Sequence, residues 1–522
     1  MKETSIRHLN ILPPTLLLAL SALFSRFLGI VRDHLLAKTF GATAGTGIYN
    51  LDAYYAAFRI PDLLYNLLIF GAISAAFIPI FTQYKKEGKF DDAWAFASSM
   101  LHLMLIGILV ISGIAYIFAP YLVHVVASGF DPEALDVTIR LMRIMLLSPI
   151  IFAFSSVLIS IQDSFKAFFW RSLAPLFYNV GIIFGIIYFG QQFGIVGVTW
   201  GVILGAALQL VVQLPALAQV RYRHKWLLGF RRPDVREAFR LIIPRILGLS
   251  LNQLTLVINT LIASFLMTGS ITIFYLSDNL QALPLGIIAI SFAITSFATL
   301  SELATESTTE SFAMEIKRVM QQILFLIIPA TLGMLILRSE IIDVILVGGK
   351  FSAEDAQITK TVLGFLLISL FAQSLIPILS RGFYAYHNTK TPVYTALVGA
   401  VVSIGGSIIL AIKLGFGISG IAIAFSAGAI LNFILLYVFM RRKLVQYILN
   451  WANVLKMIFS GLVMAIAVAL CRQWIPYGGI LIQKIGILAL ITLIGMIVYF
   501  VMAVALDIPE RKMVWRQVKR LK

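Results

Sequence analysis

Arginine and aspartate side chains interrupt the first two long apolar stretches of the chain. Five of them form the candidate group, namely Arg26, Arg32, Asp33, Asp52 and Arg59, and Asp62 follows Pro61 in the second stretch. A charge inside a membrane span costs roughly 2.5–3.5 kcal/mol on insertion scales, so it normally faces a cavity or a partner of opposite charge. Within this group of five, three guanidinium groups against two carboxylates leave an excess of positive charge. Such a set suits a phosphate or a diphosphate, which guanidinium groups hold through paired hydrogen bonds.

The spacing of these residues leaves a structural alternative open. Arg26 and Arg32 are six residues apart, about 240° around a straight helix. A break at Gly29, or the reach of long side chains, would let both enter one cavity. Asp33 is placed to pair with an arginine. The alternative is therefore an ion-pair network between helices that binds no ligand.

Proline and glycine residues provide candidate hinges beside further polar positions. Pro61 removes a helical hydrogen bond from the second apolar stretch, and Gly71 offers a second bend. The predicted second lobe, which begins at residue 239, repeats this combination, with Pro244 next to Arg245 and Pro284 following Asn279. The alternative for each lone amide side chain, Asn259 included, is a hydrogen bond between helices, worth roughly 0.6 kcal/mol.

The composition excludes a soluble protein. The 522 residues are 60% hydrophobic and only 12% charged, with a mean hydropathy of +0.94, whereas soluble domains carry roughly a quarter charged residues. A single cysteine, Cys471, excludes a disulfide framework, and the six histidines lack zinc-ligand spacing. We therefore expect neither a catalytic residue nor a metal or cofactor. The net charge of +17 fits basic cytoplasmic loops better than nucleic-acid binding.

About fourteen apolar stretches are long enough to span a bilayer, which predicts an all-α polytopic membrane protein. They cover residues 11–36, 48–80, 93–119, 138–160, 169–189, 195–218, 239–266, 272–298, 319–338, 357–380, 394–413, 417–439, 452–473 and 482–506. Loops rich in lysine and arginine alternate along the chain with loops that contain few. This alternation predicts a multi-pass protein of the cytoplasmic membrane with both termini in the cytoplasm. The basic segment 221–236 and the tail 510–522 are expected to contact anionic lipid.

A parallel internal repeat appears at an offset of roughly 221–223 residues. Gly194-Ile-Val-Gly-Val matches Gly417-Ile-Ser-Gly-Ile, and Gly205 matches Gly428. Six stretches, an even number, separate the copies. The repeat therefore predicts two six-helix lobes with the same orientation in the membrane and a substrate path between them. The predicted parts are an N-lobe at 1–218, a basic linker at 219–238, a C-lobe at 239–443, and a last helix pair with a basic tail at 444–522.

Several motifs resemble the MurJ/MviN family of lipid II flippases, in the multidrug/oligosaccharidyl-lipid/polysaccharide exporter superfamily. The motifs that carry this resemblance are Ser25-Arg-Phe-Leu-Gly-Ile-Val-Arg-Asp33, Asp52-Ala-Tyr-Tyr-Ala-Ala-Phe-Arg-Ile-Pro61, Gly71-Ala-Ile-Ser-Ala-Ala-Phe-Ile-Pro79, Ile258-Asn-Thr-Leu-Ile-Ala-Ser-Phe265, Gly349-Lys-Phe351, Gly382-Phe-Tyr384 and Thr389-Lys-Thr-Pro-Val393. The resemblance covers nearly the whole chain and implies the same two lobes with two additional helices.

The resemblance implies transport of an undecaprenyl-diphosphate-linked peptidoglycan precursor by alternating access. It places Arg26 and Arg32 at the diphosphate and Asp52 at an acidic position of the second helix. The chain departs from the family pattern at Tyr65-Asn66, Phe70, Asn279 and Ala282. Two arginines and two acids of the pattern are thus missing. We expect Arg59 and Arg245 to take over the diphosphate contacts, with Asp33 and Asn279 also at the site.

Other functions stay open at this point. One is an exporter of another polyprenyl-linked glycan or of small molecules, although a cationic drug would favour an acidic cavity. A membrane-embedded glycosyltransferase or phosphatase would need acidic or His/Arg motifs that do not stand out here. A scaffold that has lost transport is another alternative. The membrane potential or an ion gradient could drive the cycle, with no ion readable, and cell-wall synthesis proteins are candidate partners.

Overall fold

The computed structural model describes residues 14–43, 50–66, 72–306, 308–444, 449–474 and 479–512. Within these ranges, the side chains of residues 14–16, 19, 72–75, 243–252 and 306 are not described. The chain divides into two units, and each is described by itself. Unit 1 comprises residues 1–272 with 348–352, and unit 2 comprises residues 273–347 with 353–522.

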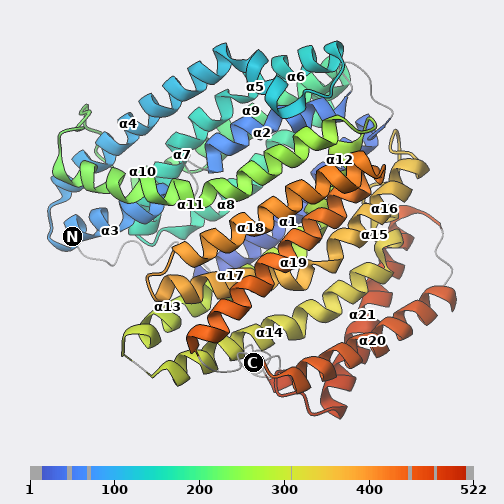
Figure 1. Cartoon of the computed structure of the whole chain (residues 1–522). Coiled ribbons are helices and arrows are strands. Elements are labelled where there is room, and N and C mark those ends of the chain that lie inside the picture. The colour runs from blue at the N-terminus through green and yellow to red at the C-terminus, as the bar shows by residue number, and fades with distance from the viewer. Residues whose placement is uncertain are drawn as a thin grey trace. The chain divides into compact units, whose positions relative to one another are not determined.

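The described residues of unit 1 are helical, and these ranges contain no β-strand. The helices are α1 (Pro14–Phe40), α2 (Leu51–Tyr65), α3 (Ala72–Lys86), α4 (Phe90–Ile117), α5 (Ala119–Ala127), α6 (Pro132–Met145), α7 (Leu147–Ser164), α8 (Phe168–Phe184), the π-helix η5 (Gly185–Phe189), α9 (Gly190–Val211), α10 (Leu214–Gln219) and α11 (Pro233–Ser264). Figure 1 shows α4, α5 and α6 following one another along one side of this unit.

The described part of unit 2 is also helical and without a β-strand, so the all-α fold class predicted from the sequence is confirmed. α12 (Ser270–Pro284) leads into this unit. The following helices are η6 (Leu285–Ala289), α13 (Ile290–Glu306), α14 (Thr309–Ile336), α15 (Arg338–Ile345), α16 (Ala353–Ile368), α17 (Leu370–Ala385), α18 (Lys390–Ser407), η7 (Ile408–Lys413), α19 (Gly417–Leu444), α20 (Trp451–Trp474) and α21 (Leu481–Ala505).

Many of these helices are long and apolar enough to cross a bilayer. Among the described residues, nine helical segments meet this criterion, and a bent pair, α16 with α17, would make a tenth. One segment, Phe168–Gln219, has 52 residues and covers two of the predicted stretches. Every predicted stretch overlaps at least one helix. The fourteen crossings stay a prediction, because several stretches fold as short or bent helices.

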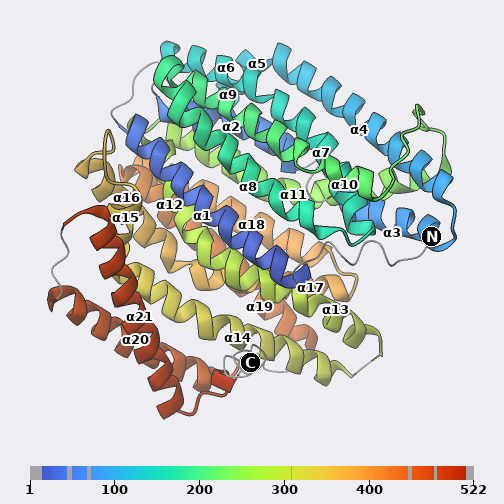
Figure 2. The same cartoon turned by 180° about the vertical axis from the view of Figure 1, so that it is seen from behind.

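Helix packing in unit 1 sets the surroundings of the candidate site. α1 packs against α8, and Figure 2 shows the two side by side. α2 packs against α5, α6 and α7, and α11 packs mainly against α3 and α5. α11 therefore groups with the first unit by its contacts, although the repeat assigns residues 239–266 to the second lobe. The lobe boundaries derived from the repeat stay a prediction.

Elements of the repeat recur at the expected offset. The π-helix η5 begins at Gly185 and η7 begins at Ile408, each after the first long helix of a tightly packed pair. Gly194 and Gly417 both adopt positive φ, 61° and 55°, which is the conformation that favours glycine. The two halves thus share helix order and local backbone irregularities, as parallel repeats do.

Candidate functional site

Arg32 forms the best-defined part of the predicted site, on α1. Its Nη2 lies 2.8 Å and its Nε 3.0 Å from one oxygen of Asp33. The expectation that Asp33 pairs with an arginine is therefore confirmed. The carboxylate compensates the charge of Arg32 in an environment where either ion alone would be costly.

A second contact ties Arg32 to α8. Arg32 Nη1 donates to Asn179 Oδ1 at 3.3 Å, and Asn179 Nδ2 donates to the backbone oxygen and the hydroxyl of Ser25, each at 3.3 Å. Asn179 was not among the residues predicted for the site. An amide inside an apolar stretch, at 169–189, was the signal that could have identified it. Asn179 thus fixes the direction of the Arg32 side chain.

Arg26 lies on the same helix, with a partly exposed side chain. α1 is continuous from Pro14 to Phe40 and passes through Gly29 without a break. A side chain added at Gly29 would meet no atom within 4 Å. The expected break at Gly29 is therefore absent from this conformation, and a hinge there stays a prediction.

Arg59 projects from α2 toward α11. Its Nε donates to Thr260 Oγ1 at 2.8 Å, and that hydroxyl donates to Leu256 O at 2.9 Å. Pro61 lies two residues later and is buried inside α2, which continues to Tyr65. Arg32 and Arg59 thus have observed partners on different helices, α8 and α11. The contacts described here do not join the two arginines.

Asp52 has a well-defined structural role. Its carboxylate accepts hydrogen bonds from the backbone nitrogens of Gly269 and Thr272, both at 2.7 Å, and from the Thr272 hydroxyl at 2.5 Å. The side chain is only 3% exposed. An anion in this place satisfies the unpaired N–H groups at the start of α12 and interacts favourably with the helix dipole. Because its oxygens are occupied, we leave Asp52 out of the proposed substrate contacts.

This role predicts a stability effect. Replacing Asp52 with alanine should lower the free energy of unfolding by about 3 kcal/mol, since two buried N–H groups and a hydroxyl lose a charged acceptor. The thermal unfolding midpoint of the detergent-purified chain measures this effect. Asp62→Ala is the matched control, because the Asp62 carboxylate accepts from Asn66 of the same segment at 2.9 Å. Equal midpoints for the two variants would contradict the role of Asp52.

Two departures from the family pattern have local explanations. The Tyr65 ring packs against Phe152 of α7, with centroids 4.7 Å apart. Asn66 folds back and donates to the backbone and side-chain oxygens of Asp62, both at 2.9 Å. At the two positions where the family pattern has a basic pair, Tyr65 thus makes a packing contact and Asn66 caps the end of α2. Phe70 and Gly71 lie outside the described residues.

In unit 2 the predicted polar positions lie on α12. Asp278 accepts from Gln281 at 3.0 Å, and Gln281 accepts from Gln373 of α17 at 3.4 Å. Asn279 is partly exposed on the same helix, next to Asp278. Pro284 ends α12, and the π-helix η6 follows immediately, so this proline does mark an irregularity. The side chains of Pro244 and Arg245 lie outside the described set.

Asn259, which precedes the partner of Arg59, is the least satisfied of the predicted polar residues. It is 2% exposed, and neither amide atom has a hydrogen-bond partner within the described part of the chain. The interpretation that this amide links helices by a hydrogen bond is therefore wrong for this conformation. A buried amide without a partner typically costs about 1–3 kcal/mol.

Comparisons with known proteins agree with these motifs. The family model "Lipid II flippase MurJ" matches residues 36–488, well over half of the chain. The chain belongs to this family. A probable lipid II flippase MurJ of Thermotoga maritima is 30% identical over 503 residues, covering 96% of this chain and 98% of its relative. One from Vibrio cholerae is 32% identical over 443 residues and covers 82% of each chain.

Solved structures support the fold. A MurJ structure in an inward closed conformation matches with a TM-score of 0.77 at 24% identity, covering 94% of this chain and 98% of that one. A multidrug resistance MATE transporter of the MOP superfamily matches with a TM-score of 0.67 at 17% identity, covering 80% and 94%. With the helices described above, membership of the MurJ family makes this chain a multi-pass membrane protein.

Proposed function

We propose that this chain is a lipid II flippase, which moves an undecaprenyl-diphosphate-linked peptidoglycan precursor across the bacterial cytoplasmic membrane by alternating access. The match to the MurJ family over residues 36–488 carries the proposal. The cationic set on α1 and α2 supports it, since a diphosphate needs guanidinium partners in an apolar environment. Transport of this kind requires no catalytic residue and no cofactor.

Arg26, Arg32 and Arg59 would contact the diphosphate, with Asp33 holding Arg32 in position. Arg245 would contribute from α11. The membrane potential would bias the cycle, because moving one charge across 100 mV is worth about 2.3 kcal/mol. The distribution of lysine and arginine supports cytoplasmic termini. Cell-wall synthesis proteins on either side of the transport step are the candidate partners.

Complementation tests the function directly. The full chain should restore growth to a bacterium whose own lipid II flippase is conditionally depleted. The control is a fluorescent fusion that verifies insertion and amount in the membrane. A chain that inserts normally without restoring growth would favour an exporter of another polyprenyl-linked glycan, or a scaffold that has kept the fold and lost transport.

A drug exporter is the second candidate, because MATE transporters share the fold. The charges on α1 and α2 oppose it: Arg26, Arg32 and Arg59 are cations, whereas a cationic drug needs unpaired carboxylates. Two acids of the predicted site, Asp33 and Asp52, contact Arg32 and the start of α12. Drug susceptibility of an expressing strain separates the two functions.

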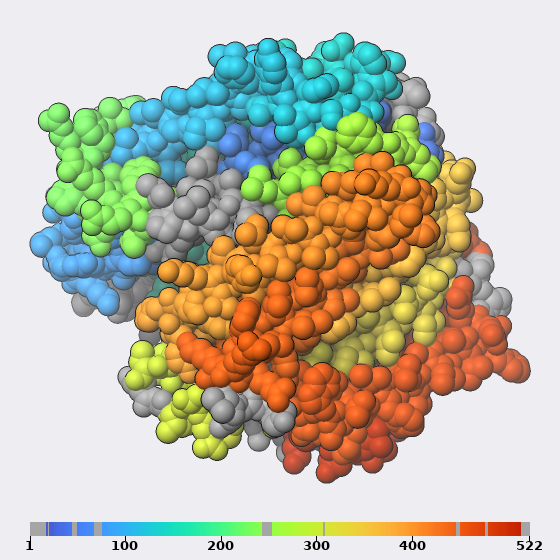
Figure 3. Space-filling view, in the orientation of Figure 1, coloured from blue at the N-terminus to red at the C-terminus, as the bar shows by residue number. Residues whose placement is uncertain are grey.

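The segment 221–236, within the basic linker 219–238, is proposed to contact anionic lipid. Figure 3 shows it protruding at the α10 end of unit 1. Lys225 lies 3.1 Å from Asp91, and Arg232 pairs with Asp234 at 2.8 Å. Burial and the hydrogen bond to Asp234 raise the pKa of Tyr84, which anchors the linker base. These contacts hold the linker against α3 and α4 and leave its tip exposed.

Trp226 at this tip is 90% exposed and is followed by three more exposed large apolar residues, Leu227, Leu228 and Phe230. Tryptophan next to cations is typical of a membrane interface. In a variant whose other six tryptophans are phenylalanine, brominated phosphatidylglycerol should quench Trp226 fluorescence. Replacing Arg223 and Arg231 with glutamine should weaken the quenching. Emission and quenching equal to those of a fully solvated tryptophan would contradict lipid contact.

A further inference from the structure

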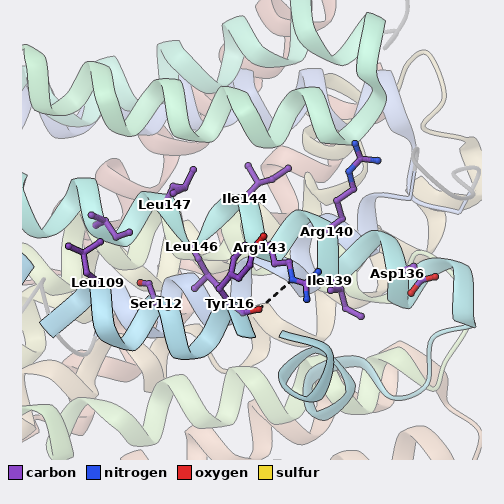
Figure 4. A pocket seen from close by; sticks show the side chains of 12 residues that line it. Leu109, Ser112, Tyr116, Asp136, Ile139, Arg140, Arg143, Ile144, Leu146 and Leu147 are labelled. Carbon is purple, nitrogen blue, oxygen red and sulfur yellow. Dashed lines mark hydrogen bonds between the residues drawn. The ribbon is translucent and has the colours of Figure 1, made fainter. Parts of the chain in front are cut away.

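A groove between α4, α6 and α7 lies outside the candidate site and has a volume of about 710 Å³. Its walls are apolar, with Leu109, Ile139 and Leu147 among them, and Figure 4 shows Arg140, Arg143 and Tyr116 along it. The groove belongs wholly to unit 1. The end of the groove that carries the arginines lies at the C-terminal end of α4, where α5 and α6 follow in the chain.

The end of the groove that carries Arg140 and Arg143 has positive charge that no described acid pairs with. Arg143 lies over the Tyr116 ring, 5.1 Å from its centroid, and its Nε is 3.4 Å from the Tyr116 carbonyl oxygen. Neither Arg140 nor Arg143 forms an ion pair with any residue in the part of the chain that is described, Asp136 included. The two guanidinium groups therefore keep hydrogen-bond donors for an anion.

Ser112 provides an independent observation. Its side chain lines the groove and is only 3% exposed, yet its hydroxyl has no hydrogen-bond partner among the described residues. Serine inside a helix usually donates to the carbonyl oxygen four residues earlier, as Thr138 does to Ala134 at 2.6 Å. A hydroxyl that makes no such bond beside a groove is a donor for a ligand.

The surface around the groove identifies the class of ligand. Exposed apolar residues surround it on α4, among them Val110, Ile114 and Ile117. In a multi-pass membrane protein, this surface faces lipid. A ligand that reaches the groove from this side must combine an apolar body with an anionic head.

We propose that this groove binds an anionic phospholipid of the adjoining leaflet. Its phosphate would contact Arg143, and an ester oxygen would accept a hydrogen bond from the Ser112 hydroxyl. An acyl chain would lie along the apolar wall beside Gly113. Arg140, which points away from Arg143 in Figure 4, would attract the anionic head without sharing the same contact. A Cβ added at Gly113 would meet no atom within 4 Å. The absence of a side chain at this position therefore keeps the groove wide. The proposal concerns a binding site separate from the arginines of α1 and α2.

Photo-crosslinking tests the site in the reconstituted full chain. A phosphatidylglycerol that carries a diazirine on its acyl chain should label peptides from α4 and α6–α7, and the phosphatidylethanolamine equivalent should label them more weakly. Arg140→Gln with Arg143→Gln should reduce this labelling at least about tenfold, as expected when a charge-assisted contact and a neighbouring positive charge are lost. Labelling of α20 and α21 is the internal reference and should not change.

A pair of glycine variants separates occupancy from charge. Gly113→Leu should fill the groove and abolish labelling there, with both arginines present. Gly107→Leu is the matched control, since Gly107 lies on the same helix with open space at its side chain and does not line the groove. Undiminished labelling in the double arginine variant, or equal labelling in the two leucine variants, would overturn the proposal.

Discussion

The variant Arg32→Ala is expected to lose growth rescue in the flippase-depleted strain and to lower transport at least about tenfold. This is the effect of losing one charge-assisted contact worth about 1.5–3 kcal/mol. The measurement is the appearance of lipid II at the outer face of the membrane, together with binding of a polyprenyl diphosphate to the purified chain. Arg26→Ala should act in the same direction.

The ion pair with Asp33 allows a sharper control. Arg32→Ala alone leaves a carboxylate that is 7% exposed without its partner, so the variant would fail even if Arg32 only neutralised Asp33. The double variant Arg32→Ala/Asp33→Asn removes both charges. If Arg32 contacts the diphosphate, the double variant stays inactive although its thermal stability recovers. Recovery of transport in the double variant would assign Arg32 a purely structural role.

Arg245 is tested in the same assay. The chain lacks two arginines of the family pattern, and we expect Arg59 and Arg245 to replace them. Arg245→Ala should therefore weaken both binding and transport. If it left both intact while Arg26→Ala abolished them, the proposed replacement by Arg245 would fail.

The second large effect concerns glycine contacts between helices. Gly399 on α18 and Gly428 on α19 lie so close that a Cβ on Gly399 would be 2.7 Å from Gly428 O. Gly399→Ala should lower the free energy of unfolding by about 3 kcal/mol, because backbone atoms cannot move aside as flexible side chains do. The thermal midpoint in detergent, followed by fluorescence-detected size exclusion, measures it.

Gly405 is the matched control on the same helix, since its added Cβ would meet nothing within 4 Å. Gly405→Ala should be neutral or stabilise the chain by about 0.5–1 kcal/mol, the difference in helix propensity.

Gly205 on α9 provides a second test of the same effect, because a Cβ added there would lie 2.4 Å from Tyr178 O. Similar midpoints for Gly399→Ala and Gly405→Ala would show that the helices can separate at little cost.

Hydropathy and the repeat predicted much of the fold, because long apolar stretches must form helices in lipid. They located each helical region, and the Gly194 and Gly417 matches coincide with two backbone irregularities at positive φ. They missed a bend: residues 357–380 appeared as one span, although α16 ends at Ile368 and α17 begins at Leu370, with an angle of 42° between them. Pro61 does not end α2, so proline alone was a poor guide to bends and breaks.

The candidate site was predicted in its residue types but not in its contacts. The pairing of Arg32 with the adjacent Asp33 was foreseeable from the sequence. The contacts of Arg32 with Asn179 and of Arg59 with Thr260 could not be foreseen, because the paired residues are 147 and 201 positions apart in the sequence. Asp52 shows the same limit: an acid near an arginine suggested a ligand contact, whereas the tertiary structure uses it to cap α12.

Asn259 has a consequence for the conformational equilibrium. Its buried amide is without a partner in the described part of the chain, so this arrangement of α11 carries an energetic cost of about 1–3 kcal/mol. Any alternative state that gives the amide a partner is favoured by the same amount, a population shift of roughly 5- to 150-fold. Asn259 therefore adds a cost to the described state that another arrangement of α11, with a partner for the amide, would remove.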